Sequence, residues 1–293
     1  MEKRNIAVLL TCHNRKAKTI GCLTSLFQAT IPQEYLLDFY LTDDGSTDGT
    51  GDAVEELFPQ VRVISGDGNL FWAGGMRLAW ATAMREKRYD AYLLLNDDVE
   101  LYPDFFMNLL EAEAFSLKET GKSGIYSGVT VDGNGEVTYG GSKVNDYLLV
   151  VRLNMLSPAE RPQACGITNA NVLWVSKEVV DEIGIFDDRF THGIADYDYS
   201  FQATRKKIPV FLAPGICGVC ADDHGRNWKG SQYPLKDRIA YLKSPKGLAY
   251  EEYLYYIGRH FPLFVPYSFI MLWMKTLFPT IWDHTKKMKK APL

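Results

Sequence analysis

The feature that most limits how this chain can fold is a short apolar run that leads directly into two adjacent acids. The segment 92–95 reads Tyr-Leu-Leu-Leu, and it is followed by Asn96, Asp97 and Asp98. An uninterrupted apolar run of this length is typical of a strand that is buried on both faces of a parallel sheet. Ionised carboxylates are rarely buried without a partner, so we expect the strand to end where the acids begin.

In open α/β sheets, ligands bind in the crevice beyond the carboxyl ends of the strands. Asp97 and Asp98 should lie in such a crevice, where a hard divalent cation takes carboxylate and phosphate oxygens as ligands. The sequence therefore predicts that these two acids hold a metal–diphosphate unit. The alternative is a polar turn without a ligand, since Asn and Asp both favour turns.

Strand and helix signals alternate four times in the first 100 residues. In the second half of the chain, one further strand is expected at 167–175. In the first 100 residues, we expect strands at 6–10, 36–41, 61–64 and 92–95. We expect helices there at 16–28, from a cap at 46–48 up to residue 57, and from 74 to about 86. This alternation indicates a parallel, doubly wound α/β unit. Because parallel strands end at one edge of the sheet, the polar loops 11–15, 43–46 and 96–98 should lie together. The sequence has neither the phosphate loop of kinase-type folds nor a Rossmann fingerprint after the first strand.

Three ordered motifs resemble those of family 2 glycosyltransferases, which are inverting enzymes with the GT-A fold. They are Thr-Cys-His-Asn-Arg at 11–15, Asp-Asp-Gly-Ser-Thr-Asp-Gly-Thr at 43–50 and Asn-Asp-Asp at 96–98. The resemblance covers about residues 5–230. It implies an α/β fold of the GT-A type, with a Rossmann-like, nucleotide-binding mixed sheet flanked by helices.

The same resemblance implies a nucleotide-sugar donor and a divalent metal, Mn²⁺ or Mg²⁺. Similar enzymes of bacterial surface-polysaccharide assembly transfer rhamnose or galactofuranose. We therefore expect a UDP- or dTDP-sugar donor, with rhamnose as the specific expectation, and a glycan or polyprenyl-linked acceptor. A bound cation would act as a Lewis acid on the departing nucleoside diphosphate.

By position, the resemblance assigns a nucleotide-binding set that includes the base pocket, the ribose and the phosphates. These residues are Thr11, His13, Asn14, Arg15, Asp44, Asn69, Gly74 and Asp97. Within it, Thr11 and His13 would line the base pocket, and Asp44 would accept a hydrogen bond from the pyrimidine imide. Asp98 would ligate the metal. Arg15 or Arg77 could add contacts to phosphate, with a solvated arginine as the alternative.

A second signature begins with Gly-Ile-Phe-Asp at 184–187 and continues to Arg205. By position it makes Asp196 the general base, because inversion needs one carboxylate to take the proton of the acceptor hydroxyl. Asp198 would either stabilise the start of a helix or contact the acceptor, since acids in a first turn also cap helices. Trp72 would pack in the core or stack on a pyranose ring. The family often has Glu where this chain has Ala195.

His224 matches a family histidine that supplies a further metal ligand. With Cys217 and Cys220 it also allows a structural zinc site, although the sequence has no second Cys pair at zinc-finger spacing. A catalytic domain is expected at 1–232, with a nucleotide-sugar half at about 1–100 and an acceptor half at about 101–232. A helical appendage is expected at 233–293.

The appendage contains a strongly apolar segment, 261–282, that is interrupted by three prolines and one lysine. Spanning a membrane needs about 20 clean apolar residues, so we expect an interfacial anchor on the inner leaflet or helices that pack on protein, including a second copy. The basic residues that follow, Lys286, Lys287, Lys289 and Lys290, favour contact with an anionic surface.

Composition excludes some classes of protein. The net charge of −4 gives no reason to expect nucleic-acid binding. Five scattered cysteines, without a secretion signal, indicate a cytoplasmic setting. If the segment 261–282 is an interfacial anchor, the protein would be peripheral on the cytoplasmic face of the membrane. Two other functions stay open: a nucleotidyltransferase, or a non-catalytic homologue that binds sugar nucleotides or glycans.

Overall fold

The computed structural model describes residues 3–147, 150–221 and 228–283. The chain divides into two compact units. One comprises Met1–Thr191 and Ala195–Asp222, and the other comprises His192–Ile194 and Asp223–Leu293.

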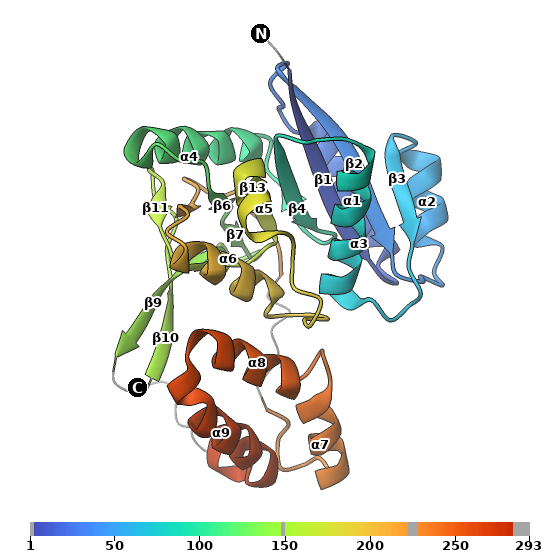
Figure 1. Ribbon diagram of the computed structural model, residues 1–293. Coiled ribbons are helices and arrows are strands. Elements are labelled where there is room, and N and C mark those ends of the chain that lie inside the picture. Colours follow the sequence, from blue (N-terminus) through green and yellow to red (C-terminus); the bar gives the residue numbers. More distant parts are fainter. Residues whose placement is uncertain (1–2, 148–149, 222–227, 284–293) are drawn as a thin grey trace. The chain divides into compact units, whose positions relative to one another are not determined.

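A mixed sheet of eight strands forms the centre of the larger unit, in the order β11-β14-β6-β13-β4-β1-β2-β3 (Figure 1). Its strands are β1 (Arg4–Cys12), β2 (Tyr35–Asp43), β3 (Val61–Ser65), β4 (Ala91–Asn96), β6 (Ile125–Ser127), β11 (Gln163–Ala164), β13 (Val172–Ser176) and β14 (Val210–Leu212). Strands β3, β2, β1 and β4 are parallel, as the alternation of elements predicts. Strand β13 then runs antiparallel to β4, which makes the sheet mixed.

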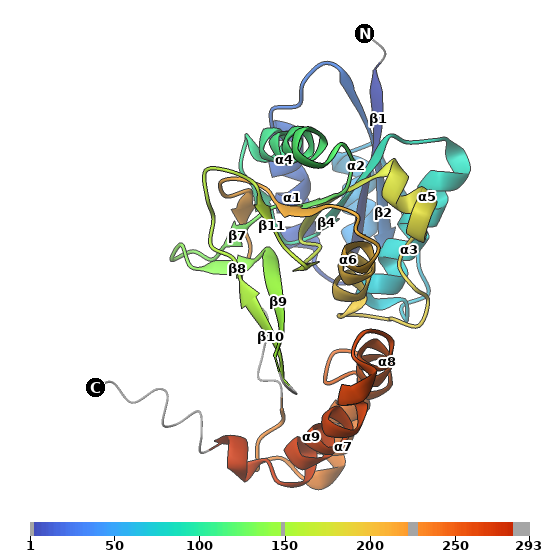
Figure 2. The same ribbon diagram turned by 60° about the vertical axis from the view of Figure 1, so that its left-hand side comes forward.

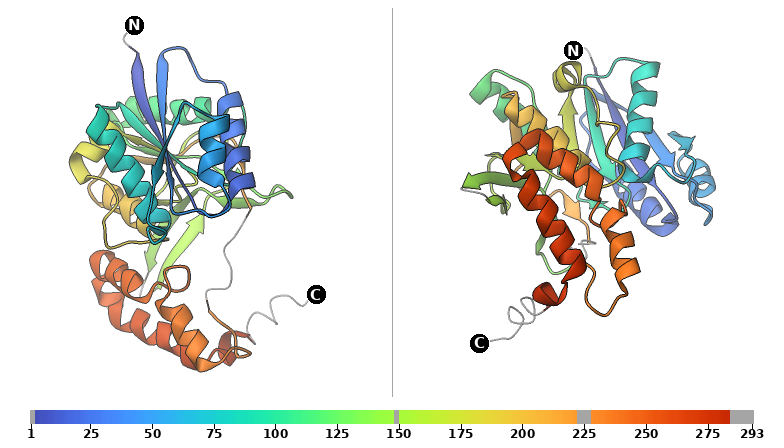
Figure 3. Two further views of the ribbon diagram at one scale, coloured as in Figure 1. Left: turned by 90° about the vertical axis from the view of Figure 1, so that its right-hand side faces the viewer. Right: turned by 60° about the horizontal axis from the view of Figure 1, so that its bottom comes forward.

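Helices cover both faces of this sheet (Figures 2 and 3). They are α1 (Lys16–Gln28), α2 (Thr50–Leu57), α3 (Phe71–Glu86), α4 (Phe105–Thr120), α5 (Lys177–Ile183) and α6 (Ala195–Arg205). Helices α1, α2 and α4 lie on one face, where Leu10 and Leu93 join the main core cluster. On the other face, Trp80 of α3 contacts Tyr92 of β4 and Tyr199 of α6. Strand residues therefore point alternately into two cores, which explains the uninterrupted apolar runs.

Two smaller sheets extend the larger unit. One has the order β10-β9-β12, and the other has the order β5-β15-β7-β8. Their strands are β5 (Glu100–Leu101), β7 (Thr130–Val131), β8 (Val137–Tyr139), β9 (Gly141–Tyr147), β10 (Val150–Met155), β12 (Ile167–Thr168) and β15 (Gly218–Val219).

Two elements differ from the expected ones. Helix α3 begins at Phe71 and not at Gly74, because the Asp44 side chain binds the Phe71 amide at 2.9 Å. The single strand expected at 167–175 is two strands, β12 and β13. Asn169 and Asn171 flank the break, where the chain leaves one sheet and enters the other.

The smaller unit is helical, with α7 (Leu235–Lys243), α8 (Tyr250–His260), the 3₁₀ turn η1 (Pro262–Phe264) and α9 (Val265–Leu277). Arg238 of α7 donates hydrogen bonds to the carbonyls of Thr276 and Leu277 at the end of α9. Helix α9 buries Ser268, Leu272 and Thr276. None of the helices in the described part of the chain is long and apolar enough to cross a membrane.

Candidate functional site

The register of the parallel strands brings the three predicted polar loops together. Thr11 lies opposite Thr42 of β2 on one side and opposite Asn96 of β4 on the other. The next pair along β1 and β2 is Cys12 and Asp43. The loops that follow these strands therefore share the carboxyl edge of the sheet, as predicted.

Hydrogen bonds join the first two of these loops directly. Asn14 has a φ of 52°, and its side-chain oxygen accepts the Thr47 amide at 2.7 Å. The Asn14 amide in turn donates to Ser46 Oγ at 2.9 Å. His13 Nδ1 donates to the Asp44 carbonyl at 2.6 Å, while Asn14 Nδ2 lies 3.1 Å from His13 Nε2. Both ring nitrogens of His13 thus have a partner, while the residue stays exposed.

Asp44 is buried, and its carboxylate organises the segment that leads into α3. One oxygen accepts the Gly68 amide and the other accepts the Phe71 amide, both at 2.9 Å. Phe71 is held at a φ of 53°, which only a strongly determined turn allows. Asn69 lies exposed between the two bonds, and Gly74 follows within the first turn of the helix.

Asp97 is buried behind the loop. Its carboxylate accepts a hydrogen bond from Thr19 Oγ1 at 3.1 Å and contacts Arg15 Nη1 at 3.2 Å. Burial raises the pKa of Asp97 to about 6, although Arg15 opposes the shift and Asp98 adds to it. The Thr19 hydroxyl and the Arg15 guanidinium, both at the start of α1, thus contact the same carboxylate, that of Asp97.

Asp98 is held from two sides. Its Oδ2 lies 2.8 Å from Arg15 Nη1 and 3.4 Å from Lys18 Nζ. Its Oδ1 accepts a weak hydrogen bond from the Cys220 thiol at 3.6 Å. Neither Lys18 nor Thr19 is among the sequence predictions. Helical spacing from Arg15 places both on one side of α1, so this signal was present in the sequence.

The donor set at this loop fits a hard divalent cation. Adjacent carboxylates with room for phosphate oxygens are the usual protein contribution to Mg²⁺ or Mn²⁺ sites at nucleotides. Among the residues that the structure describes, no group of three or more His, Cys, Asp and Glu side chains is arranged as a metal site. The expected ligand His224 lies outside the described residues.

Trp72 is bound to the acidic loop. Its Nε1 donates to the Asn96 side-chain oxygen at 2.8 Å, and its ring packs 5.5 Å from that of Phe186. Arg77 donates to the carbonyls of Asp187 and Phe190. Arg77 thereby holds the turn before α6, and Arg15 is the arginine that contacts the acids.

Asp196 lies in the first turn of α6 and is joined to the acidic loop through the connection between β12 and β13. Its Oδ2 accepts the Ala170 amide at 3.1 Å, and the next carbonyl, that of Asn171, accepts the Asn96 amide at 3.0 Å. Asn171 Nδ2 also lies 3.6 Å from the Cys220 sulfur. The segment 169–171 therefore connects both acidic sites, and sequence reasoning gave it no such role.

Asp198 lies two residues further along α6 and is buried. It accepts a hydrogen bond from Gln202 Nε2 at 2.6 Å, one turn later in the same helix. A side-chain pair at this i, i+4 spacing stabilises the helix. Contact with an acceptor stays a prediction.

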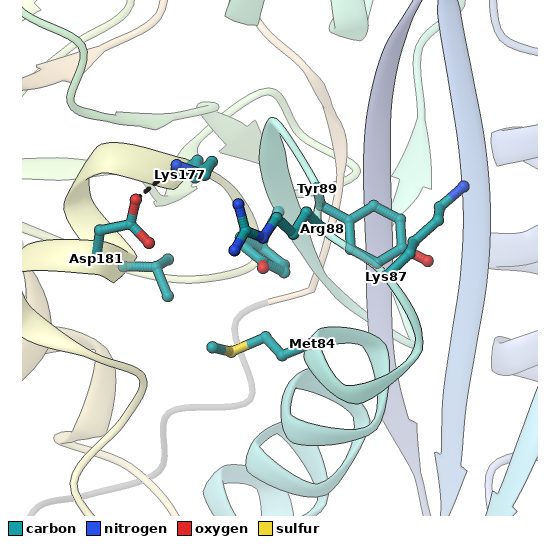
Figure 4. A pocket seen from close by; sticks show the side chains of 8 residues that line it. Met84, Lys87, Arg88, Tyr89, Lys177 and Asp181 are labelled. Atoms are coloured by element: carbon teal, nitrogen blue, oxygen red, sulfur yellow. Dashed lines mark hydrogen bonds and ion pairs between the residues drawn. The ribbon is translucent and has the colours of Figure 1, made fainter.

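A separate surface pocket of about 350 Å³ lies between the end of α3 and the start of α5 (Figure 4). Arg88, Tyr92 and the ion pair of Lys177 with Asp181 line it. Tyr92 is the second residue of β4, whereas Asp97 follows the last one. The pocket therefore lies at the opposite end of the strand from the acidic loop.

A mixed sheet with a parallel, nucleotide-binding half and acids at its carboxyl edge defines the GT-A type of protein. The family model described as Glycosyl transferase family 2 matches residues 7–165, which is more than half of the chain. The chain belongs to this family. No curated protein matches it by sequence.

Solved structures support the same fold. A mannosyltransferase from Pyrobaculum calidifontis in complex with GDP-Man and Mn²⁺ aligns over 100% of this chain and 77% of its own, with a TM-score of 0.55 and 13% identity. GalNAc-T7 with UDP, GalNAc and Mn²⁺ aligns over 81% of this chain and 47% of its own, with a TM-score of 0.55 and 14% identity. S. aureus TarS aligns over 75% of this chain and 37% of its own, with a TM-score of 0.51 and 14% identity. The predicted α/β fold of the GT-A type, with a C-terminal helical part, is confirmed.

Proposed function

We propose that this protein is an inverting glycosyltransferase that moves a sugar from a UDP- or dTDP-sugar to a hydroxyl of a glycan or lipid-linked acceptor. The observation that carries the proposal is the link from Asp196 through segment 169–171 to the loop of Asp97 and Asp98. A nucleophile-activating carboxylate and a diphosphate-binding loop must both face one anomeric carbon. Rhamnose is the specific sugar we propose, on the resemblance of the sequence motifs alone.

On this proposal, the nucleotide binds along the carboxyl edge of the sheet. The exposed His13 ring would stack on the base beside Thr11, and Asp44 would accept from the pyrimidine with the lone pairs that its two backbone bonds leave. Asn14 follows His13 on the same loop, Asn69 lies in the segment that Asp44 holds, and Gly74 lies in the first turn of α3. Because Asp44 is fixed by amides at both oxygens, the pocket would be formed before the donor arrives.

Asp98, with Asp97 behind it, would hold a divalent cation. That cation would supply Lewis-acid stabilisation of the charge that develops on the leaving diphosphate. Arg15 and Lys18 lie at the start of α1 and contact Asp98. They would donate charge-assisted hydrogen bonds to the phosphate oxygens. The Mn²⁺ in the mannosyltransferase and GalNAc-T7 structures supports this assignment.

Asp196 would take the proton of the acceptor hydroxyl as that oxygen attacks the anomeric carbon. The Ala170 and Tyr197 amides donate to its two oxygens at 3.1 and 2.8 Å and fix the orientation of the carboxylate. Each oxygen keeps a lone pair for the incoming hydroxyl. A single displacement with one base inverts the configuration at the anomeric carbon.

A panel of nucleotide-sugars, incubated with and without Mn²⁺, tests the proposal. Release of a nucleoside diphosphate that depends on Mn²⁺ and on Asp196 supports it. Release of pyrophosphate would indicate a nucleotidyltransferase, and binding without turnover under any condition would indicate a non-catalytic homologue. The anomeric configuration of the product, read by NMR, decides whether transfer inverts.

We place the acceptor at the cytoplasmic face of a membrane because of the surface of the smaller unit. Helix α9 buries Ser268 and Thr276 beside Leu272 and exposes large apolar side chains, so its exposed side is apolar, unlike that of a usual helix in water. Leu263 of η1 is 85% exposed and Ile270 of α9 is 56% exposed. The sequence after this surface carries four lysines, which would attract anionic lipid headgroups.

Sedimentation with phosphatidylglycerol vesicles, compared with phosphatidylcholine vesicles, measures this contact. Leu263→Glu and Ile270→Glu should abolish binding to the anionic vesicles. Leu57→Glu should not, although Leu57 of α2 is 57% exposed as well. If wild-type protein ignores the vesicles and Ile270→Glu instead separates a dimer, this face binds a second copy.

A further inference from the structure

Two basic side chains of the protein already form ion pairs with Asp98. Arg15 Nη1 and Lys18 Nζ both approach the same oxygen, Oδ2, at 2.8 and 3.4 Å. The Asp98 side chain is only 7% exposed, so this ion pair is largely shielded from water. The other oxygen meets the Cys220 thiol at 3.6 Å. Both oxygens of Asp98 therefore already have partners within the protein, and Oδ2 carries the two positively charged ones.

The two cations differ from Asp98 in how firmly they are fixed. The side chains of Arg15 and Lys18 are 38% and 48% exposed. Both are long and carry their charge at the end of a flexible stem, so each can swing without moving α1. Both lie at the start of α1, beside the loops that form the proposed diphosphate site.

We propose that Arg15 and Lys18 are exchangeable counterions of Asp98. In the nucleotide-free protein they neutralise this carboxylate, and when a nucleoside diphosphate enters they transfer to its phosphate oxygens and leave Asp98 free for a divalent cation. The inference rests on the proposed role of Asp98 as a metal ligand. It adds that Arg15 and Lys18 couple the binding of the two ligands.

Electrostatics explains the direction of the coupling. Asp98 cannot hold two side-chain cations and a dication at one oxygen, because like charges a few ångströms apart repel strongly in a shielded site. Phosphate oxygens accept charge-assisted hydrogen bonds from arginine and lysine at least as well as a carboxylate does. A divalent cation alone should therefore bind weakly, and the diphosphate should strengthen its binding. By linkage, the cation strengthens diphosphate binding by the same factor.

Binding of Mn²⁺ alone, followed by the EPR signal of free Mn²⁺, tests the proposal without nucleotide and without turnover. Lys18→Gln should tighten Mn²⁺ binding about 2- to 5-fold, the range expected for one partly exposed ion pair. Lys16→Gln is the matched control. It removes the same charge from the same turn of α1, and the described contacts do not join Lys16 to Asp98. We expect it to leave the Mn²⁺ affinity unchanged.

Arg15→Gln should tighten Mn²⁺ binding further, provided that the variant folds, because Arg15 also contacts the buried Asp97. Lys18→Gln carries the test if Arg15→Gln does not fold. Adding UDP should strengthen Mn²⁺ binding more in the wild-type protein than in Lys18→Gln. The gain of Lys18→Gln should vanish when Asp98→Asn is added to it.

The outcomes separate this inference from the proposed function. If Lys18→Gln binds Mn²⁺ no tighter than wild type or the Lys16→Gln control, the exchange is wrong, whether or not UDP-dependent binding is present. If Lys18→Gln does bind tighter but Asp98→Asn leaves that gain intact, Asp98 is not the ligand and the proposed metal site is wrong. A wild-type Mn²⁺ affinity that UDP does not change would also overturn the exchange.

Discussion

The Asp196 carboxylate accepts the backbone amide of Ala170 at 3.1 Å, across the gap between α6 and the β12–β13 connection. One residue later, the Asn171 carbonyl accepts the amide of Asn96. Two hydrogen bonds, one to the Asp196 side chain and one between main-chain groups, thus connect the candidate base to the acidic loop. The spacing between them is set by the main chain of two residues, Ala170 and Asn171, which is more rigid than a contact between two long side chains.

Asp196→Asn should keep the fold and the affinity for the donor and should lose transfer. The single oxygen of asparagine still accepts one of the two amides, from Ala170 or Tyr197, that donate to the two oxygens of Asp196. The asparagine side chain cannot take a proton from a hydroxyl. General-base catalysis is worth about 10²- to 10⁴-fold, so we expect kcat to fall by this factor. Donor binding by calorimetry and turnover by diphosphate release measure the two effects separately.

Asp198→Asn is the companion variant. Because Asp198 is buried and bonded to Gln202, we expect a lower melting temperature with turnover largely retained below that temperature. A fully active Asp196→Asn protein would remove Asp196 from its role. If Asp198→Asn lost transfer at full stability, Asp198 would become the candidate for the general base.

Burial of Asp97 predicts a measurable dependence of stability on pH. Its pKa is about 6 in the folded protein, compared with 3.8 for the free side chain. Between these values the folded state binds more protons than the unfolded state, so the free energy of unfolding must fall as the pH rises. For metal-free protein, the difference between wild type and Asp97→Asn should fall by roughly 2 kcal/mol from pH 4.5 to pH 7.5.

Urea unfolding in the presence of a chelator gives both free energies at each pH. The comparison uses the change with pH and not the absolute stability, because the substitution also alters the contacts with Arg15 and Thr19. Parallel pH curves for the two proteins would mean that Asp97 titrates in the folded state as it does in water.

The sequence alone predicted the parallel half of the sheet and the grouping of the polar loops at its carboxyl edge. Alternation of strands and helices predicted the parallel half of the sheet, and the register then brings Thr11 beside Thr42 and Asn96. Helix α1 was predicted at its observed bounds, since its apolar residues repeat at helical spacing from Ile20 onward. Local periodicity determines these features.

What the sequence did not predict depends on contacts between distant residues. Helix α3 begins at Phe71 because a carboxylate 27 residues earlier binds its amide. The break after Thr168 depends on a change of sheet, although Asn169 and Asn171 were a local signal for it. The contacts of Asp98 with Lys18 and Cys220 join parts of the chain that only the fold brings together.

Trp72→Phe tests whether Trp72 acts through its indole N–H. Phenylalanine keeps an aromatic ring against Phe186 but loses the bond to the Asn96 side chain. One such hydrogen bond is worth about 0.5–1.5 kcal/mol. We expect KM for the donor to rise about 2- to 10-fold with a small change in melting temperature, because the acidic loop loses its orientation.

Trp72→Leu separates this role from stacking on a sugar. It removes both the donor and the ring, so a stacking role would make it much worse than Trp72→Phe. Similar KM values for the two variants would indicate the hydrogen bond. If Trp72→Phe has wild-type kinetics and Trp72→Leu does not, the ring alone is what the site uses.

Gly75→Ala should destabilise the protein and weaken the proposed base pocket. A Cβ at this position would lie 2.9 Å from Thr11 Cβ and closer still to Thr11 Oγ1, so α3 or β1 would have to shift. The carbonyl of Gly75 also accepts the Thr42 hydroxyl at 2.8 Å, which holds the helix against β2. Overpacking of this kind costs about 1–3 kcal/mol.

Gly21→Ala is the matched control, because Gly21 is also inside a helix but has nothing within 4 Å of the added methyl group. There the substitution should stabilise by about 0.5–1 kcal/mol through helix propensity. Urea midpoints measure both, and equal effects of the two variants would mean that α3 does not pack closely on Thr11.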